Sequence, residues 1–248
     1  MRRAFTLVEL LTVVGILAIL YALAAPLAKA ALGAASGQRA RMAMGQLAAA
    51  TGLYLQDADD TYPIAMWGEG DSLRTWFGGR RGHGVFDFQS GYLSPYTKGR
   101  VPKDPLHNAI PYLGDGSGFG YNWGTIGSDM HLTGDYRTFP NCLNPAKGTE
   151  LSDPLATVLF ATSAARSVPW QGGDGRVYDF GFFDPPYFWN RNPNIDFRHG
   201  GATVVDSEAE EVRSEGRAML LFCGGQTKMV KMAEVKDEMF FRQRPEAN

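Results

Sequence analysis

Glu9 is the residue whose chemistry fits its surroundings least. It precedes a stretch from Leu10 to Ala28 that contains no charged residue and is almost entirely apolar, Ala or Gly. A carboxylate at the centre of a membrane helix costs about 2.5–3.5 kcal/mol, and less near the interface. An ion pair with an amine would lower that cost. Cleavage between Ala4 and Phe5 would create a free α-amine on Phe5, and in a staggered helical bundle that amine can pair with Glu9 of a neighbouring copy and set the axial register.

Three aspartates, Asp57, Asp59 and Asp60, offer hard oxygen ligands of the kind that calcium prefers. Asp115 and Asp174 lie in Gly-rich turns whose backbone carbonyls could add further ligands. The chain has no twelve-residue EF-hand pattern, so the alternative is a solvated acidic turn at the end of a helix. We expect no cofactor, with calcium at the first three aspartates as the alternative.

The histidines and cysteines show no metal-binding or redox spacing. His199 follows Arg198, and we expect it to form hydrogen bonds at the end of a sheet or to cap a loop. Cys142 and Cys223 either form one disulfide, if this part lies outside the cytoplasm, or remain two half-buried small hydrophobes. The serines lack a G-x-S-x-G turn, and the glycine clusters form no phosphate-binding loop. We therefore predict that the chain is not an enzyme.

Aromatic residues are frequent beyond the apolar stretch. They could form a glycan- or ligand-binding surface, but core packing of a loop-rich domain accounts for most of them. The residues in question are Trp67, Trp76, Phe77, Trp123, Trp170, Tyr187, Phe188 and Trp189.

The elements that position these groups begin with one long helix, expected from about Thr6 to about Asp57. Its first part is close to the roughly 20 apolar residues that cross a bilayer. Arg2 and Arg3 place the start of the chain on the cytoplasmic side, and Pro26 removes a backbone donor and should bend the helix. An apolar stripe with helical spacing is expected to pack on the rest of the chain; it comprises Met44, Leu47, Ala48, Thr51, Tyr54 and Leu55.

Turn signals dominate after the helix, and short strand-like runs lie between them. We expect an antiparallel sheet packed on the outer half of the helix, which makes the fold α+β. The segment Cys223–Gln226 should form a hairpin turn. Residues 68–148 contain few clear strands and are expected to be insertions and loops. The clearest strands are 157–162, 202–205, 218–222 and 227–231.

Composition sets outer limits on these expectations. The 248 residues can form one ordinary domain with an appendage. Lys and Arg number 24 against 26 Asp and Glu, so net charge gives no indication of a nucleic-acid partner.

The first residues resemble the type IV pilin and type II secretion pseudopilin family. Its signature is a short basic leader followed by Phe-Thr-Leu-x-Glu-Leu-Leu-x-Val-x-x-Ile-Leu-Ala-Ile-Leu, which matches residues 5–20. The resemblance implies that a prepilin peptidase cuts before Phe5 and methylates its amine. Glu9 matches the glutamate of this signature, and Pro26 stands where pilins commonly carry a helix-kinking proline. Ala4 departs from the glycine that the family prefers before the cut.

Further residues resemble bacterial pilin-like proteins of unknown function. The matching segments are 54–63, Leu93–Tyr96, Phe119–Asn122 and Arg198–Ala202, the last of which reads Arg-His-Gly-Gly-Ala. Those proteins continue with Phe-x-Asp-Gly-His, where this chain has Phe222-Cys-Gly-Gly-Gln226. The Asp and His are missing, so any role of that turn does not carry over, whereas a hairpin is still expected.

These resemblances imply a membrane-inserted pilin or pseudopilin that assembles into a filament. The expected organisation is a leader at 1–4, a transmembrane and filament-core helix at 5–28, its outer half at 29–60, and a β-rich domain at 61–248. The expected partners are a prepilin peptidase, other pilin or pseudopilin subunits, and the inner membrane with its assembly machinery. The domain would lie outside the cytoplasm. The alternative is an exported or anchored ligand- or glycan-binding module with an ordinary signal segment that is cut at Ala22-Leu23-Ala24.

Overall fold

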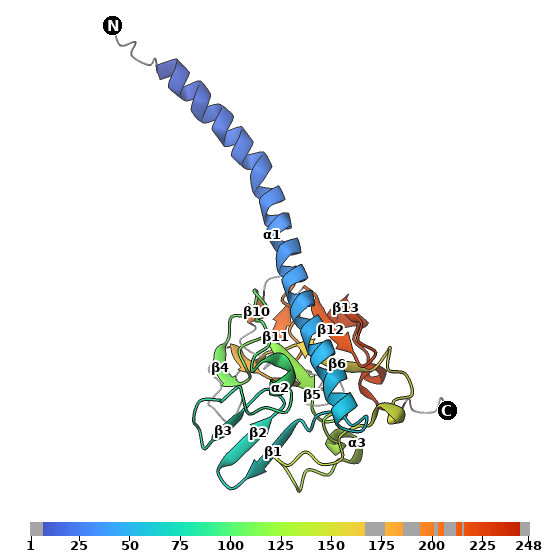
Figure 1. Ribbon diagram of the computed structural model, residues 1–248. Coiled ribbons are helices and arrows are strands. Elements are labelled where there is room, and N and C mark those ends of the chain that lie inside the picture. Colours follow the sequence, from blue (N-terminus) through green and yellow to red (C-terminus); the bar gives the residue numbers. More distant parts are fainter. Residues whose placement is uncertain are drawn as a thin grey trace. The chain divides into compact units, whose positions relative to one another are not determined.

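The computed structural model describes residues 7–166, 177–185, 194–200, 203–205, 212–214 and 216–243. Contacts divide the chain into two units, Met1–Gln38 and Arg39–Asn248. Helix α1 (Leu7–Asp57) supplies the described part of the first unit and continues into the second (Figure 1). The predicted long N-terminal helix is confirmed to within one residue at its start.

Helix α1 ends where two aspartates adopt left-handed backbone conformations. Asp59 and Asp60 have φ values of 50° and 59°. The amide of Asp60 donates to the carbonyl of Leu55 at 2.9 Å, the long-range bond of a Schellman cap. Aspartate tolerates the left-handed region better than most residues, which explains why the helix ends here.

The main sheet of the second unit has five strands in the order β13-β12-β6-β5-β9. Strand pairs β13–β12, β12–β6 and β6–β5 are antiparallel, whereas β5 and β9 are parallel. The sheet is therefore mixed, and the prediction of an antiparallel sheet is wrong for the parallel pair β5–β9 at one edge. The α+β class is confirmed. The strands are β5 (Phe119–Asn122), β6 (Val158–Thr162), β9 (Phe182–Phe183), β12 (Ala218–Phe222) and β13 (Thr227–Val230).

Smaller sheets surround the main sheet. An antiparallel meander orders its strands β1-β2-β3, a second sheet orders them β4-β8-β7, and β10 pairs with β11. Short helices α2, α3, η1, η4 and η5 connect or follow the strands. Their bounds are β1 Met66–Glu69, β2 Ser72–Thr75, β3 Gly79–Arg81, α2 Ser94–Thr97, β4 Ile110–Leu113, α3 Met130–Thr133, η1 Gly148–Glu150, β7 Ala165–Arg166, β8 Val177–Phe180, β10 Thr203–Val205, β11 Val212–Ser214, η4 Met232–Glu234 and η5 Asp237–Phe240.

Strands between residues 68 and 148 contradict the expectation of insertions and loops there. Strand β5 is an interior strand of the main sheet, paired with β6 on one side and β9 on the other. It is short and contains Gly120, so its strand signal in the sequence is weak. A Cβ at Gly120 would lie 2.6 Å from the carbonyl oxygen of Phe182 and 2.6 Å from the hydroxyl of Ser163. Glycine is therefore required for β9 to approach β5.

The core lies on both faces of the main sheet. Strand β12 alternates, with Met219 and Leu221 in the cluster that includes the helix and Leu220 in the cluster that includes Phe240. The second half of α1 runs alongside β5, β6 and β12 (Figure 1). It buries Met44, Leu47 and Thr51 from the predicted stripe, while Ala48, Tyr54 and Leu55 are half-buried. The stripe is therefore confirmed as the face that packs on the domain.

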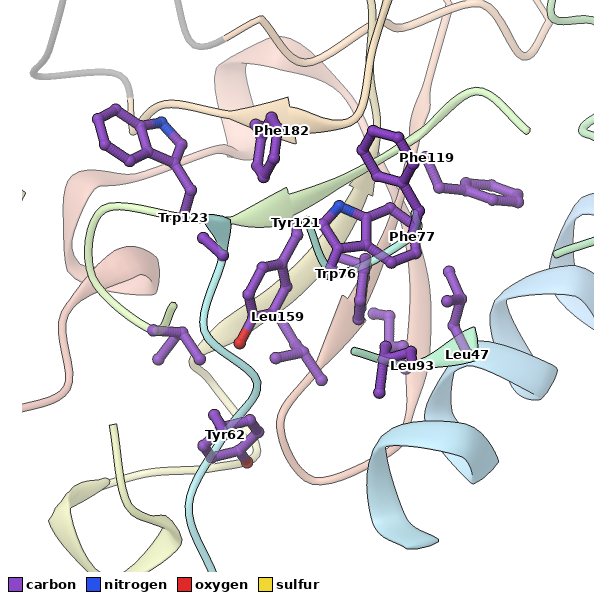
Figure 2. Packing of buried hydrophobic residues seen from close by; sticks show 14 of the residues in the cluster. Leu47, Tyr62, Trp76, Phe77, Leu93, Phe119, Tyr121, Trp123, Leu159 and Phe182 are labelled. Carbon is purple, nitrogen blue, oxygen red and sulfur yellow. The ribbon is translucent and has the colours of Figure 1, made fainter. Parts of the chain in front are cut away.

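Aromatic rings fill the centre of the helix-side cluster. The ring centroid of Trp76 lies 5.0 Å from that of Phe160 and 5.2 Å from that of Phe77. Figure 2 shows Trp76 beside Tyr121 and Phe77, with Leu93 and the helix residue Leu47 nearby. The indole nitrogen of Trp76 donates to the carbonyl of Gly181 at 2.6 Å, so the buried donor is satisfied.

Candidate functional site

The first half of α1 exposes an unusually large apolar surface. Among the described residues of Met1–Gln38, the apolar stretch is long enough to cross a membrane, and none of it is buried within the chain. Thirteen large apolar side chains between Leu7 and Leu27 are exposed, with Leu7 at 81% and Leu27 at 72%. Fully burying a side chain of this kind stabilises by about 1.5–3 kcal/mol, so covering this surface is worth on the order of 20 kcal/mol.

Glu9 is the one charged residue between Leu7 and Ala28. It lies in the first turn of α1, where the positive end of the helix dipole stabilises a carboxylate. The nearby hydroxyl of Thr12 donates within the helix, at 3.0 Å to the carbonyl of Val8 and 2.9 Å to that of Glu9. Among the residues from Leu7 to Ala28, the carboxylate is thus the single charged group that an apolar environment would have to accommodate.

Two predicted processing residues, Ala4 and Phe5, lie outside the described residues. The proposed pairing of the Phe5 amine with Glu9 therefore stays a prediction. Pro26 lies inside α1, which continues on both sides of it. The bend expected at this proline also stays a prediction.

The three aspartates considered for calcium have different surroundings. Asp57 accepts a hydrogen bond of 2.7 Å from the hydroxyl of Tyr96. Asp60 accepts one of 3.0 Å from the amide of Thr149, while Asp59 is exposed in the helix cap. Across the described part of the chain, no group of three or more His, Cys, Asp or Glu side chains is arranged to hold a metal ion. Asp174, the aspartate of a Gly-rich turn, lies outside the described residues.

Asp115, the other turn aspartate, is buried rather than open to a cation. Its Oδ1 accepts a hydrogen bond from the amide of Ser117 at 2.8 Å, whereas Oδ2 has no hydrogen-bond partner. Burial raises the pKa of the Asp115 carboxyl to about 7, and the nearby charge of Asp179 adds to the increase. This carboxyl can therefore change its protonation state near neutral pH.

A buried group of charged side chains joins three segments of the domain. The Arg198 guanidinium lies 2.7 Å from Oδ2 of Asp196 and 2.7 Å from Nδ1 of His107, and it donates to the carbonyl of Ser163 at 2.6 Å. Nε2 of His107 lies 2.8 Å from Asp179. Since arginine can only donate, Nδ1 of His107 must accept, which assigns its proton to Nε2 facing Asp179.

His199 completes this buried group. Its Nε2 lies 3.0 Å from Oδ2 of Asp104, and its backbone forms a two-way bridge with Arg217 at the start of β12. The expectation that His199 forms hydrogen bonds at the end of a sheet is confirmed. The Arg198 and His107 side chains leave no room for a side chain at Gly118, whose Cβ would lie 2.5 Å from each of them. All members are buried and paired with one another, so the group acts as an internal brace.

Sequence reasoning missed Asp104, His107 and Asp179. His107 contacts Arg198 across 91 residues of sequence, and Asp104 contacts His199 across 95. Asp179 joins the group through His107. No local spacing links these residues. The one available signal was the Arg198-His199 pair itself, which suggested polar contacts without naming the partners.

Both cysteines are free thiols, so the structure contains no bridge between them. Cys142 is fully buried and Cys223 is half-buried. Burial raises the pKa of each thiol to about 12. The structure therefore matches the alternative of two independent small hydrophobes.

Core packing accounts for most of the predicted aromatic residues that the structure describes. Trp76, Phe77 and Trp123 are buried, and the indole of Trp123 donates to Asp184 at 2.7 Å. Trp67 differs, since 38% of it is exposed. The remaining four, Trp170, Tyr187, Phe188 and Trp189, lie outside the described residues.

Comparison of the chain with protein-family models, curated proteins and solved structures finds no match. The structure itself defines an α+β fold, with a long N-terminal helix and a mixed-sheet domain. Among the described residues, one helix is long and apolar enough to cross a membrane.

Proposed function

We propose that this chain is a pilin-like or pseudopilin filament subunit. It is cut before Phe5, and the new amine is methylated. Before assembly it resides in the inner membrane with its domain outside the cytoplasm. It then joins a helical filament through the first half of α1. A prepilin peptidase, other pilin-type subunits and the assembly machinery are its partners.

The observation that carries this proposal is one carboxylate, Glu9, in the first turn of an exposed apolar helix. Covering the apolar surface is worth on the order of 20 kcal/mol, against about 3 kcal/mol or less for placing one carboxylate in the membrane. Membrane insertion therefore does not depend on Glu9. A plain anchor has no use for the charge, whereas a packed bundle can use it to select one register.

The test compares Glu9→Ala, Glu9→Gln and Leu11→Ala in the full chain. Leu11 is an exposed apolar neighbour, so its truncation controls for lost surface without changing charge. We expect all three variants to fractionate with membranes, and both Glu9 variants to lose filaments or cross-links between subunits. Unchanged assembly of Glu9→Gln would contradict the charge-register argument.

Mass measurement of the mature chain separates this proposal from an exported binding module. A chain that starts at methylated Phe5 supports the filament subunit. A chain that starts at Ala25 or Ala31, and so lacks the apolar helix, supports the module and ends the proposal.

A further inference from the structure

A segment that follows the last strand crosses one face of the main sheet. Strand β13, at one edge of the sheet, ends at Val230, and the chain continues through η4 and η5 to Arg242. Phe240 packs on Phe183 of β9, the strand at the opposite edge, with ring centroids 5.6 Å apart. The edges lie four strand spacings apart, or about 19 Å. Residues 231–242, here named the strap, therefore span the width of the sheet.

Side chains of the strap cover an apolar cluster on this face. Phe240 is fully buried, and Val235 and Met239 are half-buried beside it. The cluster that they cover includes Phe183 of β9 and Leu220 of β12. Opening the strap would therefore uncover apolar surface on the sheet while the strands stay paired.

The strap is attached to the domain through its far end. The amides of Glu234, Val235 and Met239 each donate to the carbonyl three residues earlier, so these bonds close within the strap. Across the described parts of the chain, the hydrogen bonds of the strap to other segments come from Phe241 and Arg242. A segment held in this way can detach without breaking the ladders of the sheet.

Arg242 is bound by a cage of four oxygens. Its guanidinium donates to the main-chain carbonyls of Thr125 and Ser128, the latter at 2.7 Å. It also donates to the carbonyl of Asn144 and pairs with Oε2 of Glu150 at 3.2 Å. The Arg242 side chain is 11% exposed. A guanidinium suits this cage because its five N–H donors form a rigid fork, whereas a lysine presents a single point charge.

We propose that residues 231–242 open and close over the sheet as one unit, and that Arg242 is the latch that holds them closed. The guanidinium ties the strap to the loop after β5 and to η1. Hydrogen bonds to a charged group each shift an equilibrium by about tenfold or more, so the cage decides how often the strap opens. In the open state β9 and β12 present apolar side chains to the surroundings. This device does not rest on filament assembly.

Hydrogen–deuterium exchange of the full-length chain in detergent tests the proposal. In the parent, the amides of the strap should share one opening constant, about a hundredfold or more above that of β6. The amide of Ser152 should exchange with the strap, since it donates to the carbonyl of Arg242 at 2.9 Å. Urea should accelerate exchange in β6 strongly and in the strap weakly, because opening the strap exposes little surface.

Substitution of the latch should change this opening constant. We expect Arg242→Ala to raise exchange of the strap and of Ser152 by about a hundredfold or more, and to increase binding of the apolar dye ANS. Arg242→Lys reaches fewer of the four oxygens and should give an increase of about tenfold, which keeps the proposal testable if the alanine variant does not fold. Arg137→Ala is the matched control, since Arg137 is exposed and paired with Asp135, and it should leave exchange of the strap unchanged.

Two results would overturn the proposal. The first is that the strap and β6 of the parent share one opening constant and one dependence on urea, which would mean that the strap detaches only when the domain unfolds. The second is that exchange of the strap stays within about threefold of the parent in the Arg242 variants.

Discussion

Substituting Asp115 with asparagine should stabilise the domain in a pH-dependent way. The carboxyl is buried, and its pKa is raised from 3.8 to about 7. A carboxyl whose pKa is raised by folding stays protonated up to a higher pH in the folded state than in the unfolded state. It therefore causes no loss of stability below about pH 4, a growing loss between about pH 4 and 7, and the full loss above pH 7.

The size of this effect follows from the pKa difference. About three pKa units at about 1.36 kcal/mol each correspond to about 4 kcal/mol at pH 8. Asparagine keeps the acceptor for the amide of Ser117 and removes the charge beside Asp179. Because 1 kcal/mol shifts Tm by about 2–4 °C in a domain of this size, we expect Asp115→Asn to raise Tm by about 8 °C or more at pH 8.

The assay is thermal unfolding of the full chain and the variant in detergent, followed by the fluorescence of the buried Trp76 and Trp123. It is repeated from pH 4 to pH 8. Asp135→Asn is the control, since the Asp135 side chain is 41% exposed and its pKa is lowered to about 2 by its hydrogen bonds with Arg137. A difference between parent and Asp115→Asn that stays constant with pH, or a variant less stable at pH 8, would refute the reasoning.

Two further predictions concern the buried thiols and the buried arginine. With pKa values of about 12, Cys142 and Cys223 should react with iodoacetamide at pH 8 about a thousandfold more slowly in the folded chain than when unfolded in guanidinium; equal rates would contradict their burial. Arg198→Lys cannot reach His107, Asp196 and Ser163 together, so we expect a loss of about 3 kcal/mol or more in the free energy of unfolding, measured beside the exposed control Arg137→Lys. A loss below 1 kcal/mol would show that the brace is dispensable.

Helix α1 and the β12–β13 hairpin were predictable because their signals are local. The apolar stripe around Leu47 repeats at helical spacing, and its burial follows from that spacing. The amide of Gly225 donates to the carbonyl of Phe222, which closes the turn predicted at Cys223–Gln226. The unusual position of Glu9 could also be recognised from the sequence, because one charged residue beside a long apolar run is a local pattern that does not depend on distant contacts.

Strand β5 and its parallel neighbour β9 could not be predicted in the same way. They join segments about 60 residues apart, and neither is long enough to show a period. The direction of β9 depends on how the chain returns to the sheet, which no local pattern records. The mixed character of the sheet was therefore decided by the tertiary structure.

Some features of the candidate sites could likewise be predicted from the sequence, and others were decided by the tertiary structure. Residue types alone determined that α1 carries an apolar stretch able to cross a membrane, with one carboxylate near its start. Only the folded chain decided that Asp115 is buried, that His107 accepts from Arg198, and that Arg242 donates to three main-chain carbonyls. The physical reason is that hydrophobic periodicity acts over a few residues, whereas pairing and burial depend on which distant segments are brought together.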